Sequence, residues 1–205
     1  MPREIESKRN LKIIIIGDSA VGKSKMVERF LESKYTSNRL STHGCAIYEK
    51  THKLADGTST EITIWDTAGQ EKFKNLHPSY YFQADACIMV FDVTRKQTYV
   101  GLKHWYLELQ EQCGDIPVIV AANKCDINYM VTKKRFKFPS ENNLPFFFVS
   151  SADGTNIVRV FEEAICAAVG QRKFGPGDFL DECLAFFEDS ISNSDEAKEI
   201  PSNKT

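Results

Sequence analysis

The sequence lacks any long apolar run. None of its hydrophobic segments approaches the ~18 to 20 residues of a membrane-spanning helix, and LKIIII (residues 11–16) and PFFFV (145–149) are only strand-sized. The first ten residues, MPREIESKRN, are polar and charged, without the apolar core of a signal peptide, and Pro2 excludes the Met-Gly start that myristoylation requires. We therefore expect a cytoplasmic protein without a membrane span.

An excess of basic residues is also missing. The 26 Lys and Arg are outnumbered by 28 Asp and Glu, which gives a formal net charge of -2. Nucleic-acid binding needs a concentrated basic surface, so this charge argues against nucleic acid as a partner. The charge is uneven, because eight acids stand against two lysines from Asp178 onward, which leaves -6 there and +4 in the rest.

Cysteines at metal-site or redox spacing are absent as well. The six cysteines stand at positions 45, 87, 113, 125, 166 and 183 without a CxxC pair, and several fall within apolar periodic segments. Disulfides are rare in the cytosol, so we expect reduced, mostly buried thiols.

Strand-like apolar runs do recur along the chain. They are Leu11–Ile16, Cys45–Tyr48, Glu61–Trp65, Ala86–Phe91, Pro117–Ala121 and Pro145–Val149. Their alternation with longer, partly helical segments predicts an α/β fold with a six-stranded, mainly parallel sheet and helices on both faces. Only the second and third runs are close enough for a hairpin, across the turn ADGTS (55–59), so we expect one antiparallel edge strand.

Two segments show helical spacing, and the pattern is more regular in one than in the other. Residues 98–112 place apolar side chains on one face, which predicts a core-facing helix; these are Tyr99, Leu102, Trp105, Tyr106 and Leu109. Residues 131–142 are weaker, because Pro139 is expected to end or kink a helix.

Four segments make up the predicted organisation. We expect a flexible tail over 1–9, a nucleotide-binding domain over 10–172, an amphipathic helix over 173–189 and a disordered acidic tail over 190–205. The apolar stripe of the helix, Phe179, Leu184 and Phe187, either packs back on the domain or binds a partner. The protein is expected to be a monomer in isolation.

A phosphate-binding pattern follows the first strand. GDSAVGKS, Gly17 to Ser24, fits GxxxxGK[ST] and is followed by helix-like residues. The glycines let successive N–H groups face a phosphate, Lys23 reaches the terminal phosphates and Ser24 offers its hydroxyl to Mg²⁺. The predicted phosphate-side residues are Ser19, Ala20, Val21, Gly22, Lys23, Ser24 and Lys25.

A second motif, WDTAGQE (65–71), begins where the third strand ends. This places Asp66 beside the phosphate loop at the carboxyl edge of the sheet, where it can hold Mg²⁺ through water. Gly69 lets its N–H approach a terminal phosphate, and Gln70 is placed to orient an attacking water.

These motifs, together with NKCD (123–126) and SAD (151–153), resemble the Ras superfamily of small GTPases in order and spacing. HPSYYFQADACIMVFDVT and IWDTAGQEKF are similar to its Rab branch. The resemblance spans roughly residues 10–170 and implies GTP or GDP with Mg²⁺ as ligands. It identifies Thr42 as the switch threonine and Tyr35 as an aromatic against guanine.

The same resemblance implies the guanine site. Asn123, Lys124 and Asp126 match the base-reading motif, and Ser151, Ala152 and Asp153 match the loop that meets the base. A carboxylate at Asp126 accepts from guanine N1–H and its N2 amine, whereas adenine offers no such donor pair. The implied Mg²⁺ ligands are Ser24, Thr42 and Asp66.

The implied reaction is GTP hydrolysis, with Gln70, Lys23 and Gly69 as catalytic residues. It is expected to be slow without an activating protein, since no arginine is obviously poised in cis. The γ-phosphate would then hold a partner-binding arrangement that hydrolysis releases. The alternative is a scaffold that binds GTP constitutively with negligible hydrolysis.

Three departures from the Rab pattern refine this interpretation. HGCAI follows Thr42, where Rab proteins usually have a small apolar pair followed by an acidic and an aromatic residue. Cys183, the last cysteine, lies too far from the C-terminus for prenylation, so no direct lipid anchor is expected. Asp153 replaces the usual lysine. With FDVTRKQTY and the DFLDE start of the tail, these features resemble the Rab-like protein 2 subfamily, which implies a cilium or flagellum and basal-body location, with the intraflagellar transport B complex and basal-body adaptors as partners.

Asp153 leaves two interpretations open. A lysine stem would cover the base, and losing ~40 Å² of apolar cover at ~25 cal/mol per Å² weakens binding by ~1 kcal/mol, which predicts faster intrinsic nucleotide exchange. Alternatively, Asp153 only orders the turn through its own backbone.

Overall fold

The computed structural model describes residues 10–31, 40–42, 45–54, 57–67 and 78–173. The chain divides into two compact units, Met1–Ala168 and Val169–Thr205. The predicted tails over 1–9 and 190–205 and the stripe of the predicted helix at 173–189 lie outside the described residues. They stay predictions.

A seven-stranded sheet in the order β2-β3-β4-β1-β5-β6-β7 forms the centre of the first unit. The parallel strands are β4 (Ser59–Thr67), β1 (Leu11–Ile16), β5 (Ala86–Asp92), β6 (Val118–Asn123) and β7 (Phe146–Phe148). The prediction of an α/β fold is confirmed, and β3 (Cys45–Lys53) forms the expected antiparallel hairpin with β4.

One strand of the described sheet was not predicted. The three residues of β2 (Leu40–Thr42) pair antiparallel with β3 and extend the sheet beyond the six predicted strands. The sequence LST has no apolar run or alternation long enough to mark a strand, because a strand of three residues depends on its neighbour for its hydrogen bonds.

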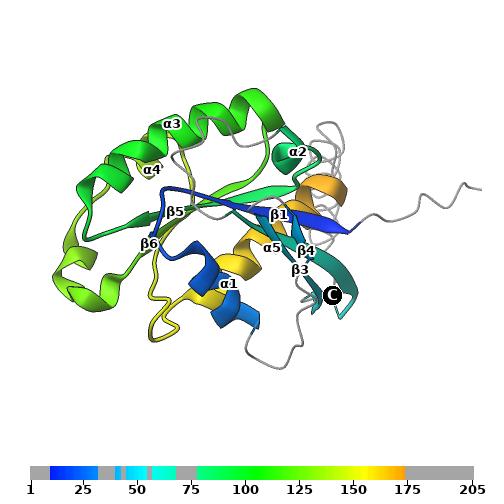
Figure 1. Ribbon diagram of the computed structural model, residues 1–205, viewed down its shortest axis with the longest axis horizontal. Helices are drawn as coiled ribbons and strands as arrows, with labels where there is room; N and C mark the ends of the chain where they lie inside the picture. The colour runs from blue at the N-terminus through cyan, green and yellow to red at the C-terminus, as the bar shows by residue number, and fades with distance from the viewer. Residues whose placement is uncertain (1–9, 32–39, 43–44, 55–56, 68–77, 174–205) are drawn as a thin grey trace, which may run out of the picture. The chain divides into compact units, whose positions relative to one another are not determined.

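Helices cover both faces of the sheet (Figure 1). One face carries α1 (Lys23–Leu31) and α5 (Ile157–Lys173), and the other carries α2 (Pro78–Tyr81), α3 (Lys96–Cys113) and α4 (Lys137–Glu141). Two 3₁₀ helices, η1 (Cys125–Ile127) and η2 (Tyr129–Lys133), follow β6. The predicted helix over 98–112 is confirmed, since α3 buries Leu102, Trp105 and Leu109 against the sheet.

The weaker helix was predicted wrongly in its bounds. Helix α4 starts only at Lys137 and contains Pro139 as its third residue. Proline is compatible with a first helical turn, because the N–H that it lacks has no partner there. Pro139 therefore neither ends nor kinks this helix.

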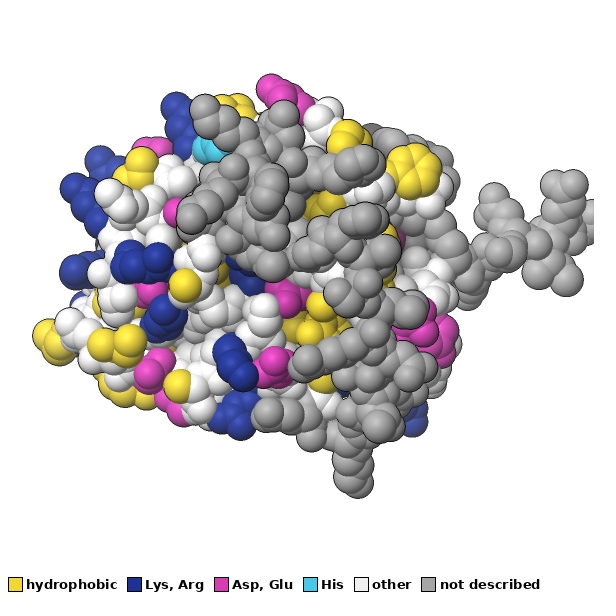
Figure 2. All heavy atoms as spheres, viewed as in Figure 1, with side chains coloured by type: hydrophobic (Ala, Val, Ile, Leu, Met, Phe, Trp, Pro, Cys, Tyr) yellow, Lys and Arg dark blue, Asp and Glu magenta, His cyan; other side chains and the backbone are white. Residues whose placement is uncertain are grey.

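Central strands β1 and β5 are buried along their whole length, as expected for strands covered on both faces. All five described cysteines are free, but the expectation of mostly buried thiols is wrong, because only Cys87 and Cys125 are buried while Cys45 and Cys113 are half-buried and Cys166 is exposed. Described charged and apolar side chains are interspersed on the face shown in Figure 2. The described helices include none that is long and apolar enough to cross a membrane.

Candidate functional site

The phosphate loop leaves β1 at a glycine that no other residue can replace without movement. Gly17 has φ +137°, and a Cβ there would lie 2.1 Å from the carbonyl oxygen of Val90 on β5. Gly22 has φ +101°, and its Cβ would lie 2.4 Å from Nδ2 of Asn123. The loop therefore fits against β5 and β6 only because these two positions lack side chains.

Ala20 is the loop's non-glycine residue in the left-handed region, with φ +56°. This conformation costs an L-residue roughly 1–2 kcal/mol. Contacts from outside the loop must offset that strain.

Lys23 lies at the start of α1 with its side chain folded inward. It is buried, and its Nζ donates to the carbonyl oxygens of Gly17 at 2.6 Å and Asp18 at 2.8 Å. The ammonium is thus held inside the curl of the loop, where the sequence predicts the terminal phosphates. The Nζ of Lys25 instead contacts Oε2 of Glu28 at 2.6 Å, and the predicted role of Lys25 at the phosphates stays a prediction.

Asn123 joins the phosphate loop to the base loop. Its fully buried amide donates from Nδ2 to the carbonyl oxygen of Val21 at 2.8 Å and to Oγ of Ser151 at 2.9 Å. Its Oδ1 accepts from the N–H groups of Lys124 at 2.8 Å and Ser151 at 3.1 Å. The structure therefore brings together three of the four predicted motifs at the carboxyl end of β6.

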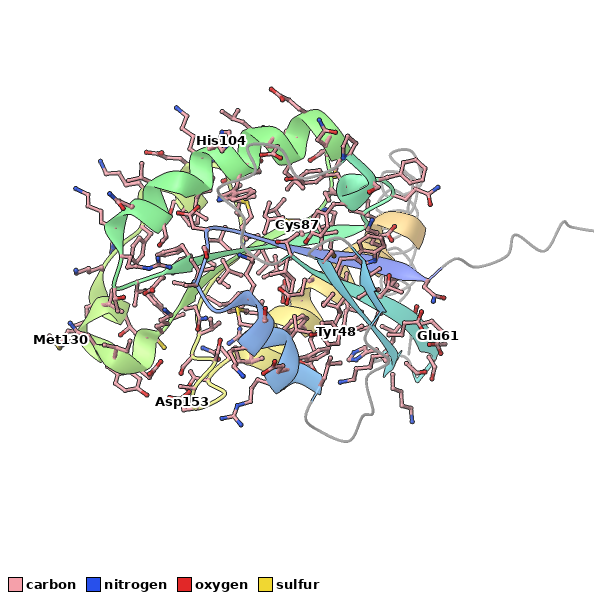
Figure 3. The ribbon with its side chains drawn as sticks, in the orientation of Figure 1. Tyr48, Glu61, Cys87, His104, Met130 and Asp153 are labelled. Atoms are coloured by element: carbon pink, nitrogen blue, oxygen red, sulfur yellow. The ribbon has the colours of Figure 1, made fainter. Side chains whose placement is uncertain are left out.

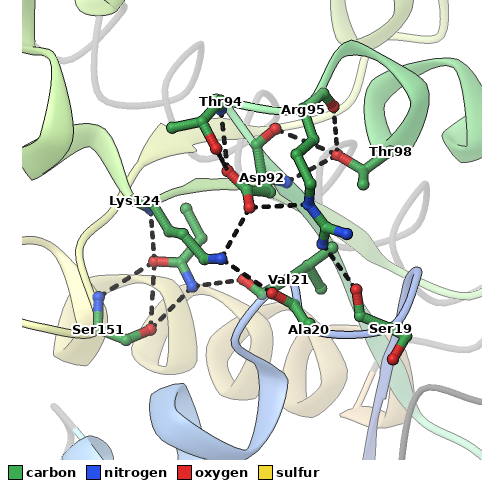
Figure 4. A network of polar contacts seen from close by, with 10 residues as sticks. Ser19, Ala20, Val21, Asp92, Thr94, Arg95, Thr98, Lys124 and Ser151 are labelled. Atoms are coloured by element: carbon green, nitrogen blue, oxygen red, sulfur yellow. Dashed lines mark hydrogen bonds and ion pairs between the residues drawn. The ribbon is translucent and has the colours of Figure 1, made fainter.

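Asp92 anchors a polar network beside Asn123 (Figure 4). The two residues pair across the ends of β5 and β6. The carboxylate of Asp92 is almost fully buried and forms ion pairs with Lys124 at 2.7 Å and Arg95 at 3.0 Å. Burial opposes its charge, but hydrogen bonds from Lys124, Thr94 and Arg95 outweigh it and lower the pKa of Asp92 to about 2.

Asp66 has surroundings that suit a residue near a magnesium ion, and its role as a Mg²⁺ ligand stays a prediction. It pairs with Ile15 at the end of β1, it is buried, and its Oδ1 has no hydrogen-bond partner among the described residues. Burial raises the pKa of Asp66, while a hydrogen bond from Ser24 and the charge of Lys23 lower it. A buried carboxylate oxygen without a partner, next to a serine hydroxyl, is a donor set that suits Mg²⁺.

Base-loop residue Asp153 has two neighbours that order the turn. Its Oδ1 accepts from the N–H of Thr155 at 2.8 Å, and its Oδ2 accepts from the hydroxyl of Tyr129 on η2 at 3.0 Å. Hydrogen bonds from Thr155, and then those from Tyr129 and Ser150, lower the pKa of Asp153 to about 2. Asp153 and Met130, the residue after Tyr129, lie at the same end of the sheet (Figure 3). The turn-ordering role is thus visible, while faster exchange stays a prediction.

Ala152 is held from both sides. Its carbonyl oxygen accepts from Arg29 of α1 at 2.5 Å, and its N–H donates to Oγ of Ser150 at 3.2 Å. Guanine O6 must therefore share this N–H with Oγ of Ser150 or displace that Oγ as its acceptor. Asp126 in η1 is half-buried and forms no hydrogen bond to any described residue, which leaves its carboxylate available to a base.

Several predicted residues cannot be placed. Tyr35, Gly69 and Gln70 lie outside the described residues. Thr42 pairs with Cys45, which pairs with Thr67, so its backbone lies two strand spacings, roughly 10 Å, from the residue after Asp66. Its side chain is not described, and its role as a Mg²⁺ ligand stays a prediction.

Asp18, Asp92 and Arg95 contact the predicted site but were not predicted as site residues. Asp18 accepts from Nε1 of Trp105 at 2.8 Å, which ties the phosphate loop to α3. A signal existed for Asp92, because it ends an apolar strand at the same sheet edge as Asn123. Nothing in the sequence marked Arg95.

Comparisons with known proteins agree with this geometry. A family model described as the Ras family matches residues 12–169. Rab-like protein 2A of Pongo abelii is 47% identical over 192 residues, which cover 94% of this chain and 82% of the relative. Rab-like protein 2B of Homo sapiens is 48% identical over 192 residues with the same coverage. GTP-binding protein ypt5 of Schizosaccharomyces pombe is 38% identical over 157 residues, 74% of each chain.

Proposed function

The chain belongs to the Ras family of small GTPases and is a Rab-like GTP-binding protein that hydrolyses GTP, and from this premise we propose that it is a switch whose GTP-bound form recruits or regulates the intraflagellar transport B complex at the ciliary base. The observation that carries the switch proposal is the amide of Asn123, which links the phosphate loop at Val21 to the base loop at Ser151. One nucleotide can therefore bridge both loops.

On the phosphate side, the ammonium of Lys23 neutralises the outer phosphates, and the loop N–H groups donate to their oxygens. Ser24 and Asp66 would hold Mg²⁺, joined by Thr42 in the triphosphate state. The ion, when bound, neutralises charge that develops between the β- and γ-phosphates. Gln70 orients the attacking water, and Gly69 lets its N–H approach the γ-phosphate.

On the base side, Asp126 accepts from guanine N1–H and the N2 amine, and Ala152 donates to O6. Tyr35 and the stem of Lys124 flank the ring. Lys124 suits this role, because its ammonium is fixed by Asp92 at 2.7 Å and by the carbonyl oxygen of Ala20 at 2.9 Å. Its aliphatic stem then spans the distance between the two loops.

The ciliary part of the proposal rests on similarity to Rab-like 2 proteins over 94% of the chain. Its location is correspondingly the cytoplasm, the basal body and the cilium or flagellum. Basal-body adaptor proteins are the other proposed partners.

Two measurements test this proposal. Purified protein loaded with GDP or with a non-hydrolysable GTP analogue is used to capture purified intraflagellar transport B subcomplexes. We expect capture by the GTP form at least tenfold above the GDP form, and equal capture would contradict the switch. Single-turnover GTP hydrolysis by wild type and Gln70→Leu then tests the scaffold alternative, which predicts no difference in phosphate release with or without the partner.

A further inference from the structure

Four successive carbonyl groups of the phosphate loop accept hydrogen bonds from donors outside the curl. Arg95 Nη2 donates to Ser19 at 2.6 Å, Lys124 Nζ to Ala20 at 2.9 Å, Asn123 Nδ2 to Val21 at 2.8 Å, and the N–H of Met26 to Gly22 at 3.0 Å. Each of these peptide groups is therefore held by its oxygen. The described chain has no cis peptide bond, so these peptide groups are trans.

Holding the oxygen also orients the next N–H. In a planar trans peptide the C=O of one residue and the N–H of the next point in opposite directions. Outward carbonyls at 19–22 thus turn the N–H groups of residues 20–23 toward the other side, where the phosphates are expected to lie. The donors outside the loop fix the direction of the donors inside it.

We propose that Arg95 is a positioning residue for the phosphate loop, acting through Ser19 to hold the N–H of Ala20 in its phosphate-binding direction and so to slow nucleotide release. This inference rests on the proposed phosphate site at Gly17 to Ser24. Arg95 contacts no nucleotide in the proposal. It acts only through the peptide group between Ser19 and Ala20.

Asp92 makes Arg95 rigid enough for this role. Nε of Arg95 donates to Oδ2 of the buried carboxylate at 3.0 Å, and the N–H of Arg95 donates to the carbonyl oxygen of Asp92 at 3.0 Å. The other carboxylate oxygen is fixed by Thr94, whose N–H and hydroxyl donate at 2.9 Å and 2.6 Å. With Nε held, the planar guanidinium presents Nη2 to Ser19 (Figure 4).

One carboxylate therefore coordinates two adjacent peptide groups. The same Oδ2 that holds Arg95 also holds Lys124, whose ammonium contacts the carbonyl oxygen of Ala20. The second of these peptides follows Ala20, the residue at φ +56°. Arg95 and Lys124 thus hold the loop on both sides of its strained residue.

GDP release from wild type, Arg95→Ala, Arg95→Lys and Lys96→Ala tests the proposal. Lys96→Ala is the matched control, because it removes the same charge from the neighbouring residue, which is exposed. A half-exposed, charge-assisted hydrogen bond is expected to change the rate about three- to tenfold. We expect that acceleration in Arg95→Ala and less than twofold in Lys96→Ala. Lysine cannot bind Asp92 and Ser19 with one fork, so Arg95→Lys should restore the rate only in part.

Equilibrium binding of GDP and GMP separates positioning from general destabilisation. GMP lacks the outer phosphate and contacts less of the loop. Arg95→Ala should therefore weaken the binding of GDP at least threefold more than the binding of GMP. A smaller ratio, or release of GDP from Arg95→Ala less than threefold faster than from wild type, overturns the role of Arg95. Lys23→Ala tests the underlying phosphate site. If this variant binds GDP as tightly as wild type, the proposed function fails. If Lys23→Ala loses GDP binding while the GDP release rate of Arg95→Ala equals that of wild type, only this inference is refuted.

Discussion

Asp92→Asn removes the charge at the centre of the network while keeping the side chain's size. The pKa of Asp92 is lowered from 3.8 to about 2 in the folded protein. At ~1.4 kcal/mol per pKa unit, the ionised form stabilises the fold by roughly 2 kcal/mol at neutral pH. The substitution is therefore expected to lower the free energy of unfolding by about that amount, or the melting temperature by roughly 5–10 °C.

The pH dependence of this difference follows from the direction of the shift. Because the folded pKa lies below the unfolded one, the contribution is fully present well above 3.8 and is lost as the pH falls through about 2. Linkage with these two values leaves about half of the difference at pH 3. The free energies of unfolding of wild type and Asp92→Asn should thus converge as the pH falls.

Urea unfolding of GDP-loaded protein at pH 7, 5, 4 and 3 measures this difference. Glu163→Gln, an exposed acid on α5, is the control and should change the free energy of unfolding by less than about 0.5 kcal/mol at every pH. A difference below about 1 kcal/mol for Asp92→Asn at pH 7, or one that stays constant down to pH 3, would refute the reasoning.

Three further predictions concern the nucleotide site. Gly22→Ala should abolish GDP binding in a filter assay, because its Cβ would lie 2.4 Å from Nδ2 of Asn123. Gly114→Ala, which shares the strain of a positive φ (+67°) but has open space around its Cβ, should still bind GDP. Chelation of Mg²⁺ should accelerate GDP release in wild type, measured with a fluorescent analogue, but have less than half that effect in Asp66→Asn; an equal effect would remove Asp66 from the proposed Mg²⁺ site. Asp153→Lys should slow GDP release about five- to sevenfold, from ~1 kcal/mol of restored apolar cover, and an unchanged rate would leave Asp153 with its turn-ordering role alone.

The parts of the fold that the sequence predicted have local causes. The buried strands β1, β5 and β6 are nearly continuous apolar runs, and α3 has a regular stripe, so their patterns are visible without the rest of the molecule. Strand β2 was missed because three residues carry no pattern, and α4 was misplaced because a proline near a helix start looks the same in sequence as one near its end.

The candidate site follows the same division. Lys23, Asn123 and Asp66 belong to motifs of fixed spacing, and the structure places them at one edge of the sheet. Asp92 and Arg95 depend on the register of β5 against β6, which pairs Asp92 with Asn123. Such pairing joins residues 31 positions apart and leaves no short-range pattern in the sequence.

Nucleotide preference tests the central claim most directly, because it requires the base-reading residues and the phosphate loop to act on one ligand. Wild-type protein is expected to bind GTP at least a hundredfold more tightly than ATP or XTP, since Asp126 accepts from the N1–H and N2 amine of guanine. Xanthine carries an oxygen in place of the amine, so Asp126→Asn, whose amide can donate to that oxygen, should reverse the order and prefer XTP. If wild type binds GTP and ATP equally, or if Asp126→Asn keeps the preference for GTP, the site does not read guanine in the way proposed.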